Sequence, residues 1–313
     1  MKAALLFPGQ GAQHAGMGRD IAEAYPPAAE IFSRADQILG FELSKLCFEG
    51  PPEKLDTTEI SQPAIFTTSA AILEALEASP DATKIRPDVT AGLSLGEYTA
   101  LYAAGMISFE DGLVVTAARG RAMQAAAEAS EGGMLGIIGL DEEKVEQICR
   151  QASEGEILEA VNFNCPGQVV ISGAKSACKR AEKLADEYGA VKAVPLAVAG
   201  AFHTDMMAPA AEKLRQALEQ CQITEPADIK TIANIDAQYY DSADKIRESL
   251  TKQLTTPLLW QKCMERLIAD GVESFYEIGP GRVLTGLMRR INRKIKVVTL
   301  GTADAIGALV DHS

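Results

Sequence analysis

Residues 89–104 read VTAGLSLGEYTALYAA, and this stretch decides the fold that we expect. Residues 89–93 are a short strand candidate, and residues 95–104 have helical character. Ser94 stands between them in the pattern Gly-x-Ser-x-Gly, in which the glycines allow a tight turn with crowded backbones. A strand that turns through a serine into a helix is typical of a nucleophile elbow in an α/β protein. The alternative is a serine that caps the helix between two turn glycines.

Strands and helices alternate on both sides of this stretch. Helical spacing or helical character also marks seven segments, at 18–39, 63–78, 109–128, 204–221, 241–254, 257–270 and 282–293. Strand candidates lie at 2–7, 229–235, 274–278 and 295–300. Such an alternation predicts a largely parallel sheet that helices cover on both faces.

A different order appears in the middle of the chain. Strand candidates and helix candidates follow one another there as β-α-β-β-α-β over about 65 residues, between 134 and 198. This order is the ferredoxin-like arrangement. The sequence therefore predicts an α/β core made of residues 1–129 and 198–313, with an inserted small domain at 130–197.

Charge and length exclude several function classes. The chain has 313 residues, of which 47% are hydrophobic, so it can bury a substantial core. The formal net charge of −13 argues against nucleic-acid binding and against adhesion to anionic membranes, because both need positive charge. One local exception is a basic cluster, consisting of Arg289, Arg290, Arg293, Lys294 and Lys296. It is either a solvated helix C-terminus or a docking patch for an acidic partner.

Apolar runs and cysteines indicate the compartment. No apolar run approaches the roughly 20 residues of a membrane span, and the N-terminal MKAALLFPGQ is too short an apolar stretch for a signal peptide. The six cysteines are scattered and never form C-x-x-C. We therefore expect reduced thiols in a cytoplasmic protein, and no zinc site.

A serine nucleophile needs a base, and the chain has three histidines. His312 is the penultimate residue, and His14 lies in the glycine-rich loop FPGQGAQHAGMG at 7–18. His203 follows the strand candidate at 191–198 and precedes a helix, so it is the best candidate base for Ser94. The loop at 7–18 does not match the dinucleotide-binding pattern Gly-x-Gly-x-x-Gly, and it lacks the Gly-Lys-Ser/Thr that ends a phosphate-binding P-loop. We therefore interpret it as a tight turn with free N–H groups.

Six blocks of sequence occur in an order that resembles a known family. They are FPGQGAQ (7–13), GLSLGEYTAL (92–101), ARGRAMQ (118–124), NCPGQVVISG (164–173), GAFHTDMM (200–207) and IGPGRVLTGL (278–287). Together they resemble the malonyl-CoA:acyl-carrier-protein transacylase family of fatty-acid synthesis and the related acyltransferase domains of polyketide synthases. The resemblance spans residue 4 to about 300. It implies an α/β-hydrolase-like core with a ferredoxin-like insert.

The resemblance implies roles for matching residues. Ser94 matches the serine that is acylated, and His203 matches the general base. The backbone N–H groups of Gln10 and Leu95 match the oxyanion donors. The residue that matches the histidine-orienting position is Gln253, through its backbone carbonyl, which explains why no acidic third member of a triad stands out.

Substrate recognition is implied in the same way. Arg119 matches the arginine that grips the free carboxylate of malonate, for which a planar guanidinium is suited. Phe202 resembles the bulky residue of malonyl-selecting relatives. Leu93 departs from the commonest pattern, which has histidine there. Asn162 and Asn164 are candidate contacts of the thioester or coenzyme A. Polar residues are equally expected at these positions for a structural reason, because they precede the turn at Pro166-Gly167.

The expected reaction is ping-pong transfer of malonyl from malonyl-CoA, the co-substrate, to the phosphopantetheine thiol of acyl carrier protein, without a bound cofactor or metal. The sequence leaves open a trans-acting polyketide synthase acyltransferase. It also leaves open a serine hydrolase of acyl thioesters, which shares the elbow and the histidine. A non-catalytic scaffold with this fold is the third alternative.

Overall fold

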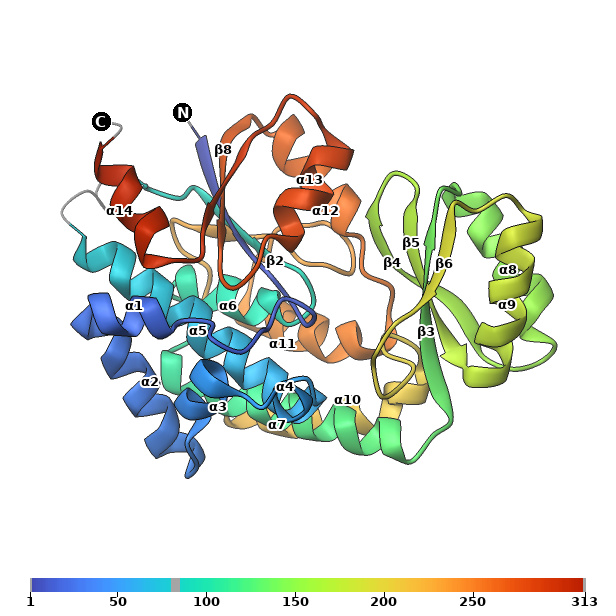
Figure 1. The fold of residues 1–313 in the computed structure, drawn as a ribbon, viewed down its shortest axis with the longest axis horizontal. Coiled ribbons are helices and arrows are strands. Elements are labelled where there is room, and N and C mark those ends of the chain that lie inside the picture. Colours follow the sequence, from blue (N-terminus) through green and yellow to red (C-terminus); the bar gives the residue numbers. More distant parts are fainter. Residues whose placement is uncertain (1, 80–84, 312–313) are drawn as a thin grey trace.

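The larger part of the molecule is built on a five-stranded parallel sheet (Figure 1). The structure is a computed structural model that describes residues 2–79 and 85–311. The strands run in the order β7-β2-β1-β8-β9, and every neighbouring pair is parallel. Their bounds are β1 Lys2–Phe7, β2 Val89–Gly92, β7 Lys230–Thr231, β8 Val272–Ile278 and β9 Val297–Leu300.

Helices cover both faces of this sheet, because the buried apolar side chains of β1 point alternately to one face and to the other. Leu5 and Phe7 join one apolar cluster, whereas Ala4 and Leu6 join another on the opposite face. The first cluster is packed by α1 (Arg19–Ala24), α2 (Pro26–Leu39), α3 (Leu43–Glu49), α5 (Thr58–Ala78), α6 (Gly96–Ala103), α7 (Phe109–Glu128), α10 (Ala208–Gln220), α11 (Ala243–Lys252) and α14 (Ala303–Asp311). The second is packed by α12 (Trp260–Ala269) and α13 (Val283–Ile291).

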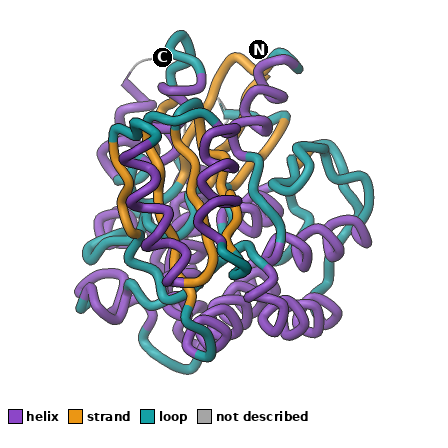
Figure 2. The backbone as a smooth tube through the Cα atoms, turned by 90° about the vertical axis from the view of Figure 1, so that its right-hand side faces the viewer, coloured by secondary structure: helices purple, strands orange, loops and turns teal. Residues whose placement is uncertain are grey.

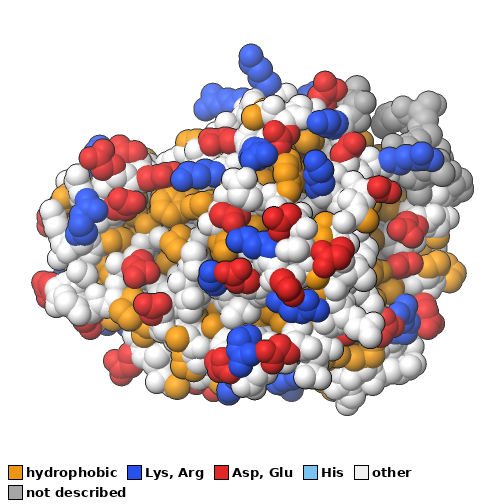
Figure 3. All heavy atoms as spheres, turned by 180° about the vertical axis from the view of Figure 1, so that it is seen from behind, with side chains coloured by type: hydrophobic (Ala, Val, Ile, Leu, Met, Phe, Trp, Pro, Cys, Tyr) orange, Lys and Arg blue, Asp and Glu red, His pale blue; other side chains and the backbone are white. Residues whose placement is uncertain are grey.

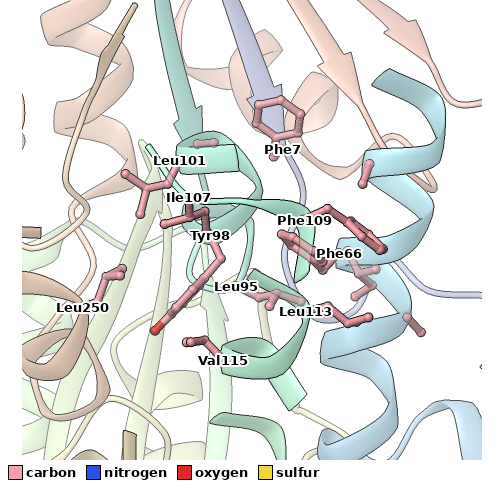
Figure 4. Close-up of a cluster of buried hydrophobic side chains, with 14 of the residues drawn as sticks. Phe7, Phe66, Leu95, Tyr98, Leu101, Ile107, Phe109, Leu113, Val115 and Leu250 are labelled. Carbon is pink, nitrogen blue, oxygen red and sulfur yellow. The ribbon is translucent and has the colours of Figure 1, made fainter. Parts of the chain in front are cut away.

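The first cluster contains the aromatic centre of the molecule (Figure 4). The rings of Phe66 on α5 and Phe109 on α7 are stacked, with centroids 5.8 Å apart. Leu95 and Tyr98 extend from the turn before α6 and from α6 into the same cluster, and both are fully buried. The segment around Ser94 therefore rests on a rigid apolar base.

A four-stranded antiparallel sheet forms the second part of the molecule, on the right of Figure 1. Its strands are β3 (Gly132–Ile138), β4 (Leu158–Cys165), β5 (Gln168–Ala174) and β6 (Lys192–Pro195), in the order β4-β5-β3-β6. The helices α8 (Glu142–Ser153) and α9 (Lys175–Glu187) pack on one face of it (Figure 2). The chain order and the strand order are those of a ferredoxin-like unit.

Backbone hydrogen bonds join the small sheet to the segment that precedes α12 in the larger part of the molecule. The N–H of Phe163 on β4 donates to the carbonyl of Leu258 at 2.9 Å, and the N–H of Leu258 donates to the carbonyl of Val161 at 2.7 Å. Leu258 is fully buried. These bonds fix β4, an edge strand of the small sheet, against the larger part of the molecule.

The predicted fold class, an α/β protein with a parallel sheet and a smaller inserted unit, is confirmed. The division into 1–129 with 198–313 and 130–197 stays a prediction. Some elements differ from the expected ones: β7 is two residues long instead of spanning 229–235, and α3, α4 (Pro52–Leu55) and α14 were not predicted. Helix α5 begins at Thr58 and contains Pro63, because its burial against α7 and α2 outweighs the hydrogen bond that proline lacks.

Surface charge is mixed on the face opposite that of Figure 1, where acidic and basic side chains are interspersed (Figure 3). Within residues 2–79 and 85–311, no helix combines the length and the apolar character that a membrane crossing needs.

Candidate active site

The turn between β2 and α6 has the geometry of a nucleophile elbow. Ser94 has a φ of +52°, in the left-handed region that residues other than glycine seldom occupy. A Cβ on Gly92 would lie 1.9 Å from the carbonyl of Gly96, and a Cβ on Gly96 would lie 2.1 Å from the carbonyl oxygen of Phe7. Both glycines are therefore required by close backbone contacts, and Ser94 is held at the carboxyl end of the parallel strand.

His203 meets Ser94 from the loop that precedes α10. Its Nε2 lies 3.2 Å from Ser94 Oγ, and its Nδ1 lies 2.7 Å from the backbone carbonyl of Gln253. Because a carbonyl only accepts, Nδ1 carries the proton and Nε2 is free to accept one. Burial lowers the pKa of His203 to about 4, opposed by the bond to Gln253. The imidazole is therefore a neutral base at neutral pH.

Arg119 on α7 reaches the same serine from the other side. It is almost fully buried, and its Nη2 donates to Ser94 Oγ at 3.0 Å and to Gln253 Oε1 at 2.8 Å. Its Nη1 donates to Gln62 Oε1 on α5 at 2.7 Å. Helices α5 and α7 lie close together here because residue 120 is a glycine: a Cβ on Gly120 would lie 2.7 Å from the backbone oxygen of Thr58 on α5. The buried Nε of Arg119 has no hydrogen-bond partner among the described residues.

Burial lowers the pKa of the Arg119 guanidinium, and the nearby Tyr98 and Glu97 oppose that shift. The guanidinium carbon also lies 5.5 Å from the centre of the Tyr98 ring, a cation–π contact. The hydrogen bonds that Arg119 makes in the described residues go to uncharged side chains, those of Gln62, Ser94 and Gln253. A buried cation of this kind is suited to receive an anion from a ligand.

Two further buried residues complete the elbow, and sequence reasoning missed both. Asn234 Oδ1 accepts from the N–H of Ser94 at 2.7 Å, and its Nδ2 donates to the carbonyl of Gly92 at 2.7 Å. Glu97 accepts from Gln253 Nε2 at 2.6 Å and from the hydroxyl of Tyr240. Glu97 stands within the quoted stretch, but a single acid in the first turn of a helix gives no sign that it is buried.

The loop after β1 lies against the elbow. A Cβ on Gly9 would approach Leu95 N to 3.8 Å and the carbonyl oxygen of Leu93 to 2.3 Å, so the two turns touch. The backbone N–H groups of Gln10 and Leu95 have no acceptor among the described residues. Two free amides beside a nucleophile are the elements of an oxyanion hole.

A cavity of about 330 Å³ opens above Ser94 between the two parts of the molecule. Arg119 and His203 line it together with Gln10. Its apolar wall comes from Leu93, Met123, Met134, Leu196, Val198 and Phe202. Asn162 also lines it and has a buried Oδ1 without a partner in the described residues, whereas Asn164 is buried outside the lining.

The other histidines do not join this site. His14 is exposed and bonds only the neighbouring carbonyl of Ala15, and His312 lies outside the described residues. In the part of the chain that the structure describes, no group of three or more histidine, cysteine or acidic side chains is placed to hold a metal ion. The arrangement at Ser94 therefore offers a serine, a neutral base, two amides and a cation around one cavity.

Comparison with known proteins places this constellation in a family. The acyl transferase domain family matches residues 4–307, nearly the whole chain. The chain belongs to this family. The malonyl CoA-acyl carrier protein transacylase of Bacillus subtilis (strain 168) is 44% identical over 306 residues, which cover 97% of this chain and 95% of the relative. The enzyme of the same name from Escherichia coli (strain K12) is 40% identical, with 98% of each chain covered.

Solved structures of the acyl transferase family agree over the full length. An acyl carrier protein S-malonyltransferase from Vibrio cholerae has a TM-score of 0.93 and 40% identity, covering 99% of this chain and 100% of its own. A malonyl-transacylase solved in complex with the holo acyl carrier protein of a type II polyketide synthase has a TM-score of 0.94 and 38% identity, with both chains fully covered.

Proposed function

We propose that the chain is an [acyl-carrier-protein] S-malonyltransferase that moves a malonyl group from malonyl-CoA to the phosphopantetheine thiol of acyl carrier protein. The observation that carries this proposal is the convergence of Ser94, His203 and Arg119 on one cavity. The serine and histidine supply acyl transfer, and the buried arginine supplies recognition of a second carboxylate. The names and the high identity of the relatives support the same substrates.

The first half-reaction acylates the enzyme. His203 Nε2 takes the proton of Ser94 Oγ while Oγ forms a bond to the thioester carbon of malonyl-CoA. The thioester oxygen becomes an oxyanion that accepts from the N–H groups of Gln10 and Leu95. Collapse breaks the C–S bond, and the coenzyme A sulfur leaves with the proton from His203. The backbone carbonyl of Gln253 stabilises the imidazolium that forms in between.

The second half-reaction runs the same steps in reverse with a different thiol. His203 takes the proton of the phosphopantetheine thiol, and the sulfur attacks the ester carbon of malonyl-Ser94. The ester C–O bond breaks, and Ser94 Oγ regains its proton from His203. Water would give free malonate by the same route, so the apolar cavity wall that includes Phe202 and Met134 favours transfer over hydrolysis by limiting access of water.

Arg119 selects the acyl group. The distal carboxylate of a malonyl ester on Ser94 lies within reach of Nη2, which is 3.0 Å from Ser94 Oγ. The unpartnered Nε supplies a second donor of the same guanidinium. An acetyl ester has no group to offer them. Phe202 narrows the apolar wall, where one additional methyl group changes binding by only about 1–3 kcal/mol.

The basic cluster is the docking surface that we propose for the carrier protein. Arg289 and Arg290 end α13, and Arg293, Lys294 and Lys296 follow it. All five are exposed, and none has a carboxylate within ion-pair distance in the described residues. Arg290 also donates to the side chain of Gln168, the first residue of β5, so the cluster reaches the small sheet. Carrier proteins are typically acidic, which complements this surface.

The role that we propose for the chain is fatty-acid synthesis. The first relatives carry the transacylase name without a polyketide qualifier, whereas one structural relative serves a polyketide carrier. We also propose a cytoplasmic location and no resident cofactor. All six cysteines are free and buried, as in a protein of a reducing compartment.

The test is a two-stage incubation, first with malonyl-CoA and then with holo acyl carrier protein. The proposal expects one coenzyme A released per enzyme before the carrier is added, and malonyl-carrier afterwards. Release of free malonate at the same rate with and without the carrier would identify a hydrolase. No coenzyme A release at all would identify a scaffold. A fatty-acid carrier and a polyketide carrier, compared at equal concentration, distinguish the two pathways.

A further inference from the structure

Glu97, which no step of the proposed reaction uses, is at the centre of a buried network that includes Gln253 and Arg119. Gln253 Nε2 donates to Glu97 Oε2 at 2.6 Å and to the backbone oxygen of Ser94 at 3.1 Å. The other end of the same amide, Oε1, accepts from Arg119 Nη2 at 2.8 Å. The Gln253 amide therefore lies between a buried carboxylate and a buried guanidinium.

These two neighbours fix the direction of the amide. A reversed amide would turn its NH₂ toward the Arg119 guanidinium, where two donors would face each other. It would also turn its oxygen toward Glu97, where two acceptors would face each other. Each reversed contact replaces a charge-assisted hydrogen bond with a repulsion in a site away from water. Glu97 thus selects the orientation in which Gln253 accepts from Arg119.

The carboxylate of Glu97 is itself held from the opposite side. It accepts from the hydroxyl of Tyr240 and from the backbone N–H of Asn234. Burial raises the pKa of Glu97 to about 7, and the bonds from Tyr240, Gln253 and Asn234 and the charge of Arg119 oppose that shift. A protonated carboxyl keeps an acceptor oxygen, so the bond from Gln253 is available in both states.

We propose that Glu97 is a positioning residue for acyl-group selection: by orienting the Gln253 amide, it holds Arg119 where the distal carboxylate of a malonyl ester arrives. This inference rests on the proposed acylation of Ser94. The orientation of His203 is independent of it, because His203 bonds the backbone carbonyl of Gln253 and not its side chain. Loss of the Glu97 link therefore weakens malonyl transfer more than transfer of an acyl group without a carboxylate.

The experiment measures the ratio of kcat/KM for malonyl-CoA to kcat/KM for acetyl-CoA. The ratio does not depend on how much of each variant is folded. Glu97→Leu removes the acceptor and should lower the ratio at least about tenfold, the loss expected for one charge-assisted hydrogen bond. Glu97→Gln keeps a carbonyl for Gln253 and should hold the ratio within about twofold of the wild type. Gln253→Met removes the amide but keeps the backbone carbonyl, and should lower the ratio like Glu97→Leu.

A double-variant cycle decides whether the two residues act in one chain. In the Gln253→Met background, Glu97→Leu should cause no further fall of the ratio, because the link is already broken. Independent, additive falls would overturn the proposal. The proposal would also be overturned if Glu97→Leu kept the wild-type ratio of kcat/KM values. If Glu97→Leu fails to fold, a wild-type ratio in Gln253→Met would overturn it instead.

Tyr240→Phe is the matched control. It removes a different donor from the same buried carboxylate and leaves the Gln253 amide in place. Its ratio should stay near that of the wild type, and a fall as large as in Glu97→Leu would mean general loosening of the core and would overturn the proposal. Failure of the proposed function would give a different result from failure of this inference, because the wild type itself would then form no malonyl enzyme.

Discussion

Asn234→Ala tests how the elbow is held in its left-handed turn. The Asn234 side chain is fully buried and bonds the backbone that enters the elbow, at the Ser94 N–H and at the Gly92 carbonyl, each at 2.7 Å. Alanine leaves one donor and one acceptor buried without a partner. Each orphaned group costs about 1–3 kcal/mol, so we expect the free energy of unfolding to fall by about 2–6 kcal/mol.

Urea unfolding measures this change. The single tryptophan, Trp260, is buried, and its fluorescence reports the unfolding transition. Asn164→Ala is the control, since Asn164 is also buried but its Oδ1 has no partner in the described residues. We expect the control to lose less than about 1 kcal/mol. Equal losses in the two variants would refute the argument that Asn234 holds the elbow.

The remaining predictions concern the chemistry. Arg119→Ala should lower malonyl loading at least about a hundredfold and acetyl loading far less, because only malonate offers a carboxylate to the lost donors; equal losses for both acyl groups would exclude a carboxylate clamp. Since the pKa of His203 is lowered to about 4, the acylation rate should stay constant as pH falls from 7.5 to about 5.5 and decline only near 4. The same pH profile is measured in Glu97→Gln, because the pKa of Glu97 is also shifted and this variant removes its titration. A midpoint of the pH profile near 6.5, the ordinary pKa of histidine, would contradict a buried neutral base. Alanine at three positions of the basic cluster, namely 290, 293 and 294, should raise the KM for the carrier protein and leave malonyl-CoA acylation unchanged; an unaltered carrier KM would remove the cluster from the docking surface.

Local features of the sequence predicted the elbow. The strand, the glycines and the helix around Ser94 are neighbours in the chain, and the contacts of Gly92 and Gly96 explain why no larger residue fits. His203 could be found by elimination, because only three histidines exist. The role of Arg119 came from the family resemblance alone, since a helix arginine is usually solvated.

The polar network behind the elbow could not be predicted. Asn234 bonds Ser94 across 140 positions of sequence, and Gln253 bonds Glu97 across 156. Nothing local distinguishes these side chains from exposed polar residues, since their burial depends on the packing of distant elements. The two-residue β7 and the short helices α3 and α4 were missed for a related reason, because elements of a few residues carry too little periodicity.

In the proposed reaction, Ser94 carries the malonyl group from one substrate to the other. Incubation of the enzyme with malonyl-CoA alone, followed by peptide mapping with mass spectrometry, tests it most directly. We expect one malonyl group on the peptide that contains Ser94, no such group in Ser94→Ala, and its loss from the wild type when holo carrier protein is added. An adduct on another residue, or malonyl-carrier formed at the normal rate by Ser94→Ala, would show that Ser94 is not the residue that carries the malonyl group.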